Sequence, residues 1–455
     1  MKFVDMDVDC IESCLEHLSF DELLSAAASN KRINQAAKFI YSRKFSSKKI
    51  SFSVNKGFEA QLVNRIVYFG DDSLEDHSFR DLKSSLKFLR CFGQLLTNIE
   101  IRFQNDMQND MFMFGDFPDG RNAPNKFIWT QHVIEYVNEY CAESLLDVHF
   151  YGIRDLPNYL KKPFSRVKNI TLENCYFSDL VENNWLNDRF PRMQELHLNL
   201  TYSNDVGSFK FIENCFGFLE HLNISMQVFY CTDDHYRIVE PGINSFRRNI
   251  LALFHLNPQL KHLEIFAADF FYKKCPFIGA NDLQSVNKSL QNLESLKLNI
   301  HYQFNSGFNG DFIHFKNLKS LTCYVKVALS FPIPFVSDKL DTLHLVNRKP
   351  LSEFEYEFIA KHPTITQLSF INVNQGTDVN ISKIANALPS IERLTIGHFI
   401  KIESLIPHWT KFQKLKEISF RYKGLVQQNE LVPLLIDGWS VSIVTYGFIK
   451  LIRSK

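Results

Sequence analysis

One short pattern of apolar and polar positions returns along most of the chain. In the segment Pro191–Leu198 an apolar residue is followed by two variable residues, a leucine, one variable residue and a second leucine. Similar segments are Leu219–Ile224, Leu260–Ile265, Leu293–Leu298 and Leu340–Leu345. Alternation of this kind is typical of strands with one buried face. The pattern therefore predicts many similar strands, with apolar side chains in a core and the intervening side chains facing outward.

The spacing of these strands predicts their architecture. Each segment has three apolar positions, and the second of them is called its middle position. The middle positions of most neighbouring segments are 22 to 26 residues apart, a period typical of leucine-rich repeats. We expect an α/β fold: a leucine-rich-repeat solenoid with a curved parallel sheet on the concave face and helices and loops on the convex face. The middle positions are Ile99, Val148, Ile170, Leu196, Leu222, Leu263, Leu296, Leu321, Leu343, Leu368, Leu394, Ile418 and Val444.

Flanking residues support the repeat. A proline precedes the first apolar position at residues 191, 258, 363 and 389, where it ends the preceding helix. Phenylalanines such as Phe190, Phe254 and Phe412 can stack between neighbouring units on the convex side. Three intervals exceed one period, and we expect loops or a degenerate unit at 102–130 and loops around Cys231–Gly242 and Ala267–Asn281.

The outward positions form the candidate partner-binding surface. Their charges are mixed and include a few aromatic side chains, which suits recognition of another protein. His149, His197, His221 and His262 share this face, but no spacing of ligands demands zinc, so we expect no metal and no cofactor. The candidates are His149, Tyr151, Glu195, His197, Asn199, Asn223, Glu264, Phe266, Lys297, Tyr324, His344, Arg393 and Arg421.

The first residues predict three short helices that precede the repeats. Apolar residues between Cys10 and Leu18 form a helical stripe, and Ser19 with Glu22 forms a capping box at the start of a second helix. Asn30 can cap a third helix, which carries Ile33 on its apolar side. Helices this short cannot bury enough of their own surface, so we expect them to pack on a partner or on the following domain.

This N-terminal segment resembles an F-box. The resemblance rests on the stripe ending in His17-Leu18, then Ser19-x-Asp21-x-Leu23-Leu24, then Asn30-Lys31-Arg32 before an apolar residue. It implies docking on a Skp-type linker protein, which connects F-box proteins to a cullin–RING ubiquitin ligase. By resemblance, the linker-binding residues are Met6, Asp7, Ile11, Leu15, Leu18, Leu23, Leu24, Asn30 and Ile33.

The segment also departs from the F-box pattern. Met6-Asp7 stands where the family has Leu-Pro, and Ser29 and Ile33 replace the usual valine and aromatic residue around the basic pair. Each change removes apolar contact area from the linker interface. The alternative interpretation is a helical cap that covers the first strand of the solenoid.

Composition and motifs narrow the possible functions. The net charge of +1 predicts no general attraction to nucleic acid or membranes. Nine scattered cysteines, with no signal peptide or long apolar run, suit a reduced protein of the cytoplasm and/or nucleus. No nucleotide-binding, metalloprotease or serine-hydrolase motif is found, so we expect no enzyme activity in this chain.

The resulting hypothesis is an F-box at residues 1–46 followed by about 13 irregular leucine-rich repeats at 47–455. Such a protein would be the substrate-recognition adaptor of an SCF-type ubiquitin ligase, and its repeats would bind a protein target. One alternative is a leucine-rich-repeat scaffold that acts independently of a ubiquitin ligase. An enzyme would require a pocket with perturbed titratable groups.

Overall fold

The chain divides into two compact units, which are described separately. One unit holds residues 1–219 and 226–250, and the other holds residues 220–225 and 251–455. The computed structural model describes residues 6–45, 49–56, 62–69, 82–103, 124–153, 155–175, 177, 184–202, 209–228, 233–269, 278, 280–300, 312–325, 333–347, 351–372, 380–399, 411–421, 438–445 and 448–453.

The first unit begins with the three expected helices, each with a side-chain cap. Asp7 accepts a hydrogen bond from the first backbone N–H of its helix. The Ser19 N–H donates to Glu22 Oε2 at 2.9 Å, as a capping box requires, and the Ser19 bonds lower the pKa of Glu22. Asn30 Oδ1 accepts the Arg32 N–H at 2.8 Å. The helices are α1 (Val8–Leu15), α2 (Phe20–Ala27) and α3 (Lys31–Phe45).

An aromatic cluster joins these helices to helix α4 (Leu82–Phe92). Tyr41 stacks on Phe92 with ring centroids 4.7 Å apart, and Phe88 lies 5.6 Å from Phe20 and 6.0 Å from Tyr41. Tyr41, Phe88 and Phe92 have no exposed surface. The small helical segment thus packs on the chain behind it, as expected from its size, while the proposed domain boundary after residue 46 stays a prediction.

The sheet of the first unit is mostly parallel, in the order β6-β5-β4-β3-β1-β2. Strands β1 and β3 to β6 run parallel, and β2 pairs with β1 in the antiparallel direction. The middle positions Ile99, Val148, Ile170 and Leu196 pair residue for residue. The strands are β1 (Lys49–Lys56), β2 (Leu62–Phe69), β3 (Asn98–Phe103), β4 (Asp147–Tyr151), β5 (Asn169–Glu173) and β6 (Glu195–Tyr202).

The strands of the second unit follow in the order β17-β18-β16-β15-β14-β13-β11-β9-β8-β7, and β7 belongs to this unit as far as residue 225. From β8 to β16 the paired strands are parallel, and their predicted middle positions pair directly. The strands are β7 (His221–Val228), β8 (His262–Asp269), β9 (Ser295–Ile300), β11 (Ser320–Val325), β13 (Thr342–Asn347), β14 (Gln367–Asn372), β15 (Arg393–Phe399), β16 (Glu417–Arg421), β17 (Trp439–Thr445) and β18 (Phe448–Arg453).

Val444 was expected to continue the parallel series, and this prediction is wrong. Its strand β17 pairs antiparallel with β18, which in turn pairs antiparallel with β16. Alternating apolar residues predict a strand but not its direction, and only the two residues at 446 and 447 separate β17 from β18. So short a connection suits a hairpin, because a parallel crossover needs a dozen or more residues.

A repeated backbone hydrogen-bond pattern connects successive parallel strands. The carbonyl of Lys261, just before β8, accepts the N–H groups of Glu294 and Ser295 at the start of the next strand. In the first unit the carbonyl of Lys168 accepts the N–H groups of Gln194 and Glu195 in the same way. One carbonyl oxygen can accept two bonds because it has two lone pairs. This repetition and the residue-for-residue pairing are consistent with a leucine-rich-repeat type of fold.

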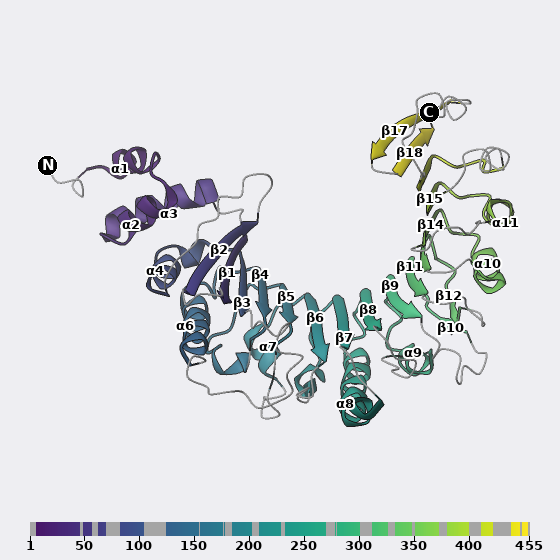
Figure 1. The fold of residues 1–455 in the computed structure, drawn as a ribbon, viewed down its shortest axis with the longest axis horizontal. Coiled ribbons are helices and arrows are strands. Elements are labelled where there is room, and N and C mark those ends of the chain that lie inside the picture. The colour runs from purple at the N-terminus through teal and green to yellow at the C-terminus, as the bar shows by residue number, and fades with distance from the viewer. Residues whose placement is uncertain are drawn as a thin grey trace. The chain divides into compact units, whose positions relative to one another are not determined.

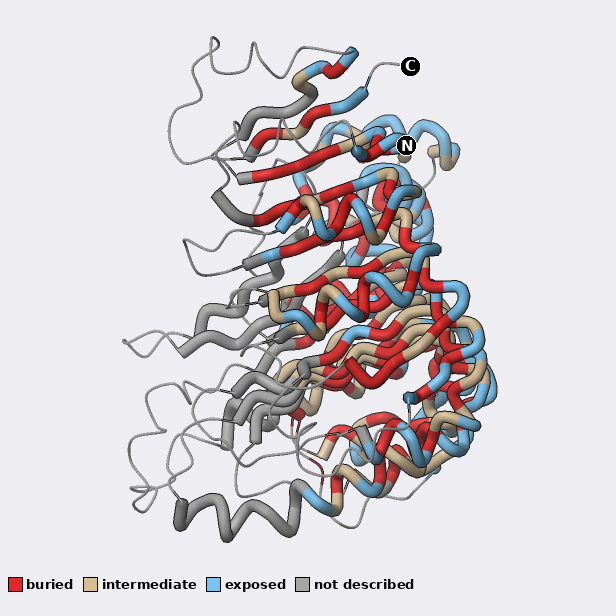
Figure 2. The backbone as a smooth tube through the Cα atoms, turned by 90° about the vertical axis from the view of Figure 1, so that its right-hand side faces the viewer, coloured by how far each residue is buried: buried red, intermediate tan, exposed pale blue. Residues whose placement is uncertain are grey.

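Helices and short helical turns lie along one face of each unit's sheet (Figure 1). Buried residues follow the strands and the inner sides of these helices (Figure 2). Phe164 and Phe190 stack with ring centroids 5.4 Å apart, as the predicted phenylalanine stacking requires. The remaining elements are η2 (Gly93–Leu95), α6 (Pro124–Tyr140), η3 (Leu156–Asn158), α7 (Trp185–Arg189), η4 (Phe209–Ile212), α8 (Asp233–Leu256), α9 (Ala280–Val286), β10 (Ile313–His314), β12 (Phe335–Val336), α10 (Glu353–Ala360) and α11 (Ile381–Ala387).

One of the three long intervals differs from the sequence expectation. The loop expected around 231–242 is wrong, because α8 covers all but its first two residues. Proline lacks the N–H of a helix interior, yet the helix continues through Pro241 to the buried Phe246 and Ile250. Part of the interval 102–130 belongs to β3 and α6, and residues 104–123 lie outside the described part of the chain. So do residues 270–277 of the third interval.

A buried histidine makes the stability of the second unit depend on pH. His362 is 2% exposed, and its Nδ1 lies 2.8 Å from the Phe358 carbonyl while its Nε2 accepts the Ser337 N–H at 3.4 Å. This arrangement needs the neutral ring, and burial lowers the pKa of His362. The unfolded chain therefore binds the proton more readily, and stability falls as the pH drops below the ordinary histidine pKa.

We expect urea unfolding to show this dependence. Wild-type protein should lose stability between neutral and mildly acidic pH, and His362→Gln should lose less over the same interval. His17→Gln is the control, because His17 is exposed. Equal pH dependence in all three proteins would show that His362 does not contribute.

Candidate functional site

The structure separates the proposed linker-binding residues into two groups. Ile11, Leu15, Leu23, Leu24 and Ile33 are buried within the chain. Met6 and Leu18 are half-buried, while Asp7 and Asn30 are exposed. The half-buried and exposed residues can therefore contact a partner directly. The buried residues form the core that holds the helices together. Linker binding itself stays a prediction.

The apolar stripe of α1 is narrower than the sequence suggested. Ile11 and Leu15 are buried, but Cys10 and Cys14 are exposed. Successive residues of a helix are rotated by about 100° around its axis. Cys10 and Cys14, which precede Ile11 and Leu15, therefore lie away from the buried face of the helix. The exposed surface of α1 thus presents two thiols beside Asp7.

The outward positions of the strands lie where the alternating pattern predicts. In strand β4 the burial alternates between half-buried and buried, and in β6 Leu196 and Leu198 are buried while their neighbours are half-buried. Every candidate surface residue with a described side chain is half-buried or exposed, whereas the side chain of Arg421 lies outside the described part of the structure. The described residues are His149, Tyr151, Glu195, His197, Asn199, Asn223, Glu264, Phe266, Lys297, Tyr324, His344 and Arg393.

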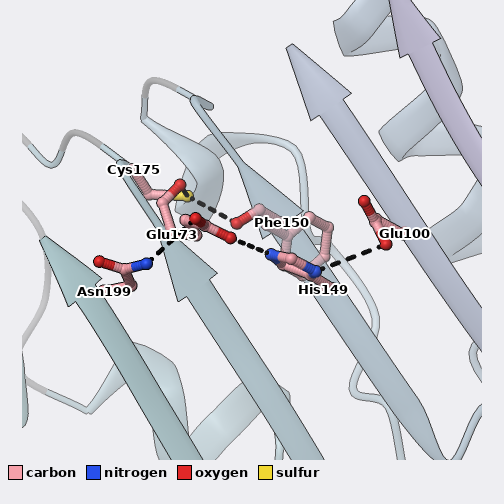
Figure 3. Close-up of polar contacts among 6 residues, drawn as sticks. All are labelled: Glu100, His149, Phe150, Glu173, Cys175 and Asn199. Carbon is pink, nitrogen blue, oxygen red and sulfur yellow. Dashed lines mark hydrogen bonds and ion pairs between the residues drawn. The ribbon is translucent and has the colours of Figure 1, made fainter. Parts of the chain in front are cut away.

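A row of polar side chains crosses four neighbouring strands of the first unit (Figure 3). His149 lies between two carboxylates, with Nδ1 3.6 Å from Glu100 Oε2 and Nε2 2.9 Å from Glu173 Oε2. Asn199 Nδ2 donates to Glu173 Oε1 at 3.0 Å. Glu100 is only 1% exposed, so this row reaches from a buried carboxylate to the accessible part of the sheet face.

Two members of this row, Glu100 and Glu173, are not among the surface candidates named from the sequence. Glu100 lies one residue after the middle position Ile99 and Glu173 three residues after Ile170, so the alternation that identified the other outward residues applies to both. The neighbouring Cys175 has a structural role, because its thiol lies 3.3 Å from the Phe150 carbonyl and burial raises its pKa to about 12. Such a thiol is not a reactive nucleophile near neutral pH.

The sheet face of the second unit combines ion pairs with aromatic contacts. Lys297 Nζ lies 3.1 Å from Glu264 Oε2, and the rings of Phe266 and Tyr324 are 5.6 Å apart in an edge-to-face arrangement. The rings of His221 and His262 stack at 4.1 Å. Burial, followed by the charge of His221, lowers the pKa of His262, so both rings are not readily charged together.

Within the described residues, no three or more histidine, cysteine, aspartate and glutamate side chains form a group suited to a metal ion. In the same part of the chain, no helix combines the length and apolar character needed to cross a membrane. The described cysteines are all free, with Cys10, Cys14 and Cys215 exposed.

No protein-family model matches the sequence, and no protein of curated function matches it. Among solved structures, the chain is similar to a chain in the structure of the Toll–Spatzle complex, described as a molecular hub in Drosophila development and innate immunity. The TM-score is 0.37 and the sequence identity 12%, with 82% of this chain and 47% of that chain covered. The chain thus spans about half the length of that chain, and a similarity at this level carries no argument about function.

The fold and the surfaces define a class of protein. The chain is a mixed α/β protein with N-terminal helices and mostly parallel sheets, in which the middle apolar positions of paired parallel strands lie directly opposite one another.

Proposed function

We propose that this protein is the substrate-recognition adaptor of an SCF-type ubiquitin ligase. The N-terminal helices would dock on a Skp-type linker, and the repeated strands would form a leucine-rich-repeat solenoid that holds a protein target. The observation that supports the proposal is the N-terminal segment, whose three helices and capping box agree with the sequence resemblance to an F-box.

The burial of the helices supports an adaptor with an attached recognition domain. The cluster of Phe20, Tyr41, Phe88 and Phe92 fixes α2 and α3 to α4, which belongs to the same compact unit as the first strands. A linker bound to these helices would be held close to that unit. The function of such an adaptor is proximity, because it raises the concentration of the target near the transferring enzyme. It would act in the cytoplasm or nucleus.

The alternative is a scaffold in which the helices only cap the repeats. It is favoured by the burial of five of the nine residues that the F-box resemblance assigns to the linker. Binding of the full-length protein to a purified Skp-type linker separates the two functions, since a capping segment has no affinity for the linker.

Leu18→Asp is the variant that tests the proposed linker surface. Leu18 is half-buried and follows the end of α1, so an aspartate there should weaken linker binding about tenfold or more while the fold is retained. Leu15 and Leu23 are unsuitable, because charging a buried side chain would unfold the helices.

Phe39→Asp is the matched control, because Phe39 lies on α3, is 56% exposed and is not among the proposed linker-binding residues. Binding can be measured by biolayer interferometry, with circular dichroism to verify folding. Equal affinities of the wild type and Leu18→Asp would contradict the proposed surface.

A further inference from the structure

Three neighbouring strands of the second unit present a surface without formal charge. The outward positions of β11, β13 and β14 form three rows in direct register. At neutral pH none of these side chains is charged. His344 is the one side chain among them that titrates near neutral pH, and burial lowers its pKa. The rows, together called the uncharged strip, are Ser320–Thr342–Gln367, Thr322–His344–Ser369 and Tyr324–Val346–Ile371.

Charged residues lie on both sides of the uncharged strip. On one side Lys297 of β9 forms an ion pair with Glu264 of β8. On the other side Arg393 of β15 is exposed, and Glu417 of β16 pairs with Lys450 at 3.0 Å. Seven of the nine positions of the strip are half-buried or exposed, and none of them holds a lysine, arginine, aspartate or glutamate, while Thr322 and Ser369 are buried. This absence of formal charge distinguishes the strip from the flanking parts of the sheet face.

The third row of the strip is apolar and accessible. Ile371 is 46% exposed, and its neighbour Val346 and the Tyr324 ring are half-buried. Gly397 on β15 leaves Ile371 open, because a Cβ at this glycine would lie 3.0 Å from the Ile371 Cα. The edge-to-face contact of Phe266 with Tyr324 extends the row by a further aromatic ring.

We infer that the uncharged strip binds an uncharged, apolar-rich extended segment of a partner protein. A segment with apolar side chains gains about 25 cal/mol per Å² of apolar surface buried on the third row. A lysine or glutamate in the same place would lose hydration and find no opposite charge within the strip. Ser320, Thr342 and Gln367 of the first row are half-buried, so their hydroxyl and amide groups can bond to the segment's polar atoms, whereas Thr322 and Ser369 of the second row are buried. This inference rests on the proposed role of the sheet face in target binding and specifies the chemistry of the target.

The test uses full-length protein and two sets of short synthetic peptides. One set contains only leucine, valine, serine, threonine and glutamine, and the other replaces alternate residues by lysine or glutamate. Fluorescence polarisation should show preferential binding of the uncharged set. Ile371→Lys should weaken this binding about tenfold or more, because it places a charge on the apolar row.

Ile452→Lys is the matched control, since Ile452 is 37% exposed on β18 and lies outside the strip. It should bind the uncharged peptides as the wild type does. Ile371→Ser serves as a second variant that removes apolar area without adding charge, and thermal unfolding verifies that each variant is folded. Ile371→Ser should also weaken binding, by less than Ile371→Lys.

Several results would overturn the inference. One is tighter binding of the charged peptides than of the uncharged peptides, and another is binding of neither set. A third such result is an equal loss of affinity for the uncharged peptides in Ile371→Lys and Ile452→Lys. Self-association of the wild type that Ile371→Lys abolishes would instead assign the strip to a second copy of the chain. Linker binding is measured in parallel and should be unchanged in Ile371→Lys. If the ligase hypothesis is wrong, the wild-type protein does not bind the linker. This outcome is independent of the result with the peptides.

Discussion

Replacing Phe88 by alanine is expected to lower the free energy of unfolding of the N-terminal part of the protein by about 3–5 kcal/mol. Phe88 is fully buried and contacts the rings of Phe20, Tyr41 and Phe92. The substitution removes apolar surface from the core and leaves a cavity between helices that come from separate segments of the chain. Amide hydrogen exchange should show faster opening of α2, α3 and α4.

The control for Phe88 is Phe39→Ala on α3. Phe39 is the same residue type but is 56% exposed, so its removal should change stability by no more than about 0.5 kcal/mol. If the amide groups of α2, α3 and α4 exchange equally slowly in Phe88→Ala and in Phe39→Ala, the aromatic cluster does not hold the N-terminal segment in place.

Replacing Asn138 by alanine should have the second-largest effect, a loss of roughly 3 kcal/mol. Asn138 of α6 is 3% exposed and connects the helix to the loop at residues 161 and 162. Its Oδ1 accepts the N–H groups of Lys161 and Lys162 at 2.8 and 2.7 Å, and its Nδ2 donates to the Lys162 carbonyl at 2.8 Å. Alanine would leave three backbone groups without these partners.

Two variants test whether these bonds cause the effect. Asn138→Asp keeps both acceptor bonds but places a charged oxygen opposite the Lys162 carbonyl at a buried site, so it should also lower stability, and less so at acidic pH, where a protonated carboxyl can donate to that carbonyl. Asn187→Ala removes a single bond to the Cys215 carbonyl at an exposed site and should cost about 1 kcal/mol or less. Urea unfolding monitored by circular dichroism measures all three, and equal losses for Asn138→Ala and Asn187→Ala would contradict this account of the loop.

Sequence periodicity was sufficient to place most of the parallel strands and the pairing of their middle positions. The leucine and isoleucine positions identified along the sequence meet in direct pairs, as at Leu343 and Leu368, because a period of two residues fixes which side chains enter the core. The capping residues Ser19 and Asn30 were also predictable, since caps depend on neighbouring backbone groups alone.

Features that depend on distant parts of the chain could not be predicted in this way. The direction of β17 follows from its pairing with β18, which the alternation of apolar residues does not encode. The burial of Leu23 and Leu24 within the chain, and not on a free surface, follows from how the three helices pack together. The ion pairs of His149 required knowledge of which strands are neighbours as well as which residues face outward.

The proposed function depends most on the affinity of the N-terminal helices for a Skp-type linker. Full-length protein mixed with the purified linker and the linker-binding half of a cullin should elute from a sizing column as a single complex at micromolar concentrations. Light scattering should give the mass of one copy of each chain. Separate elution of this protein from the linker, with the linker and cullin still bound to each other, would contradict the adaptor function.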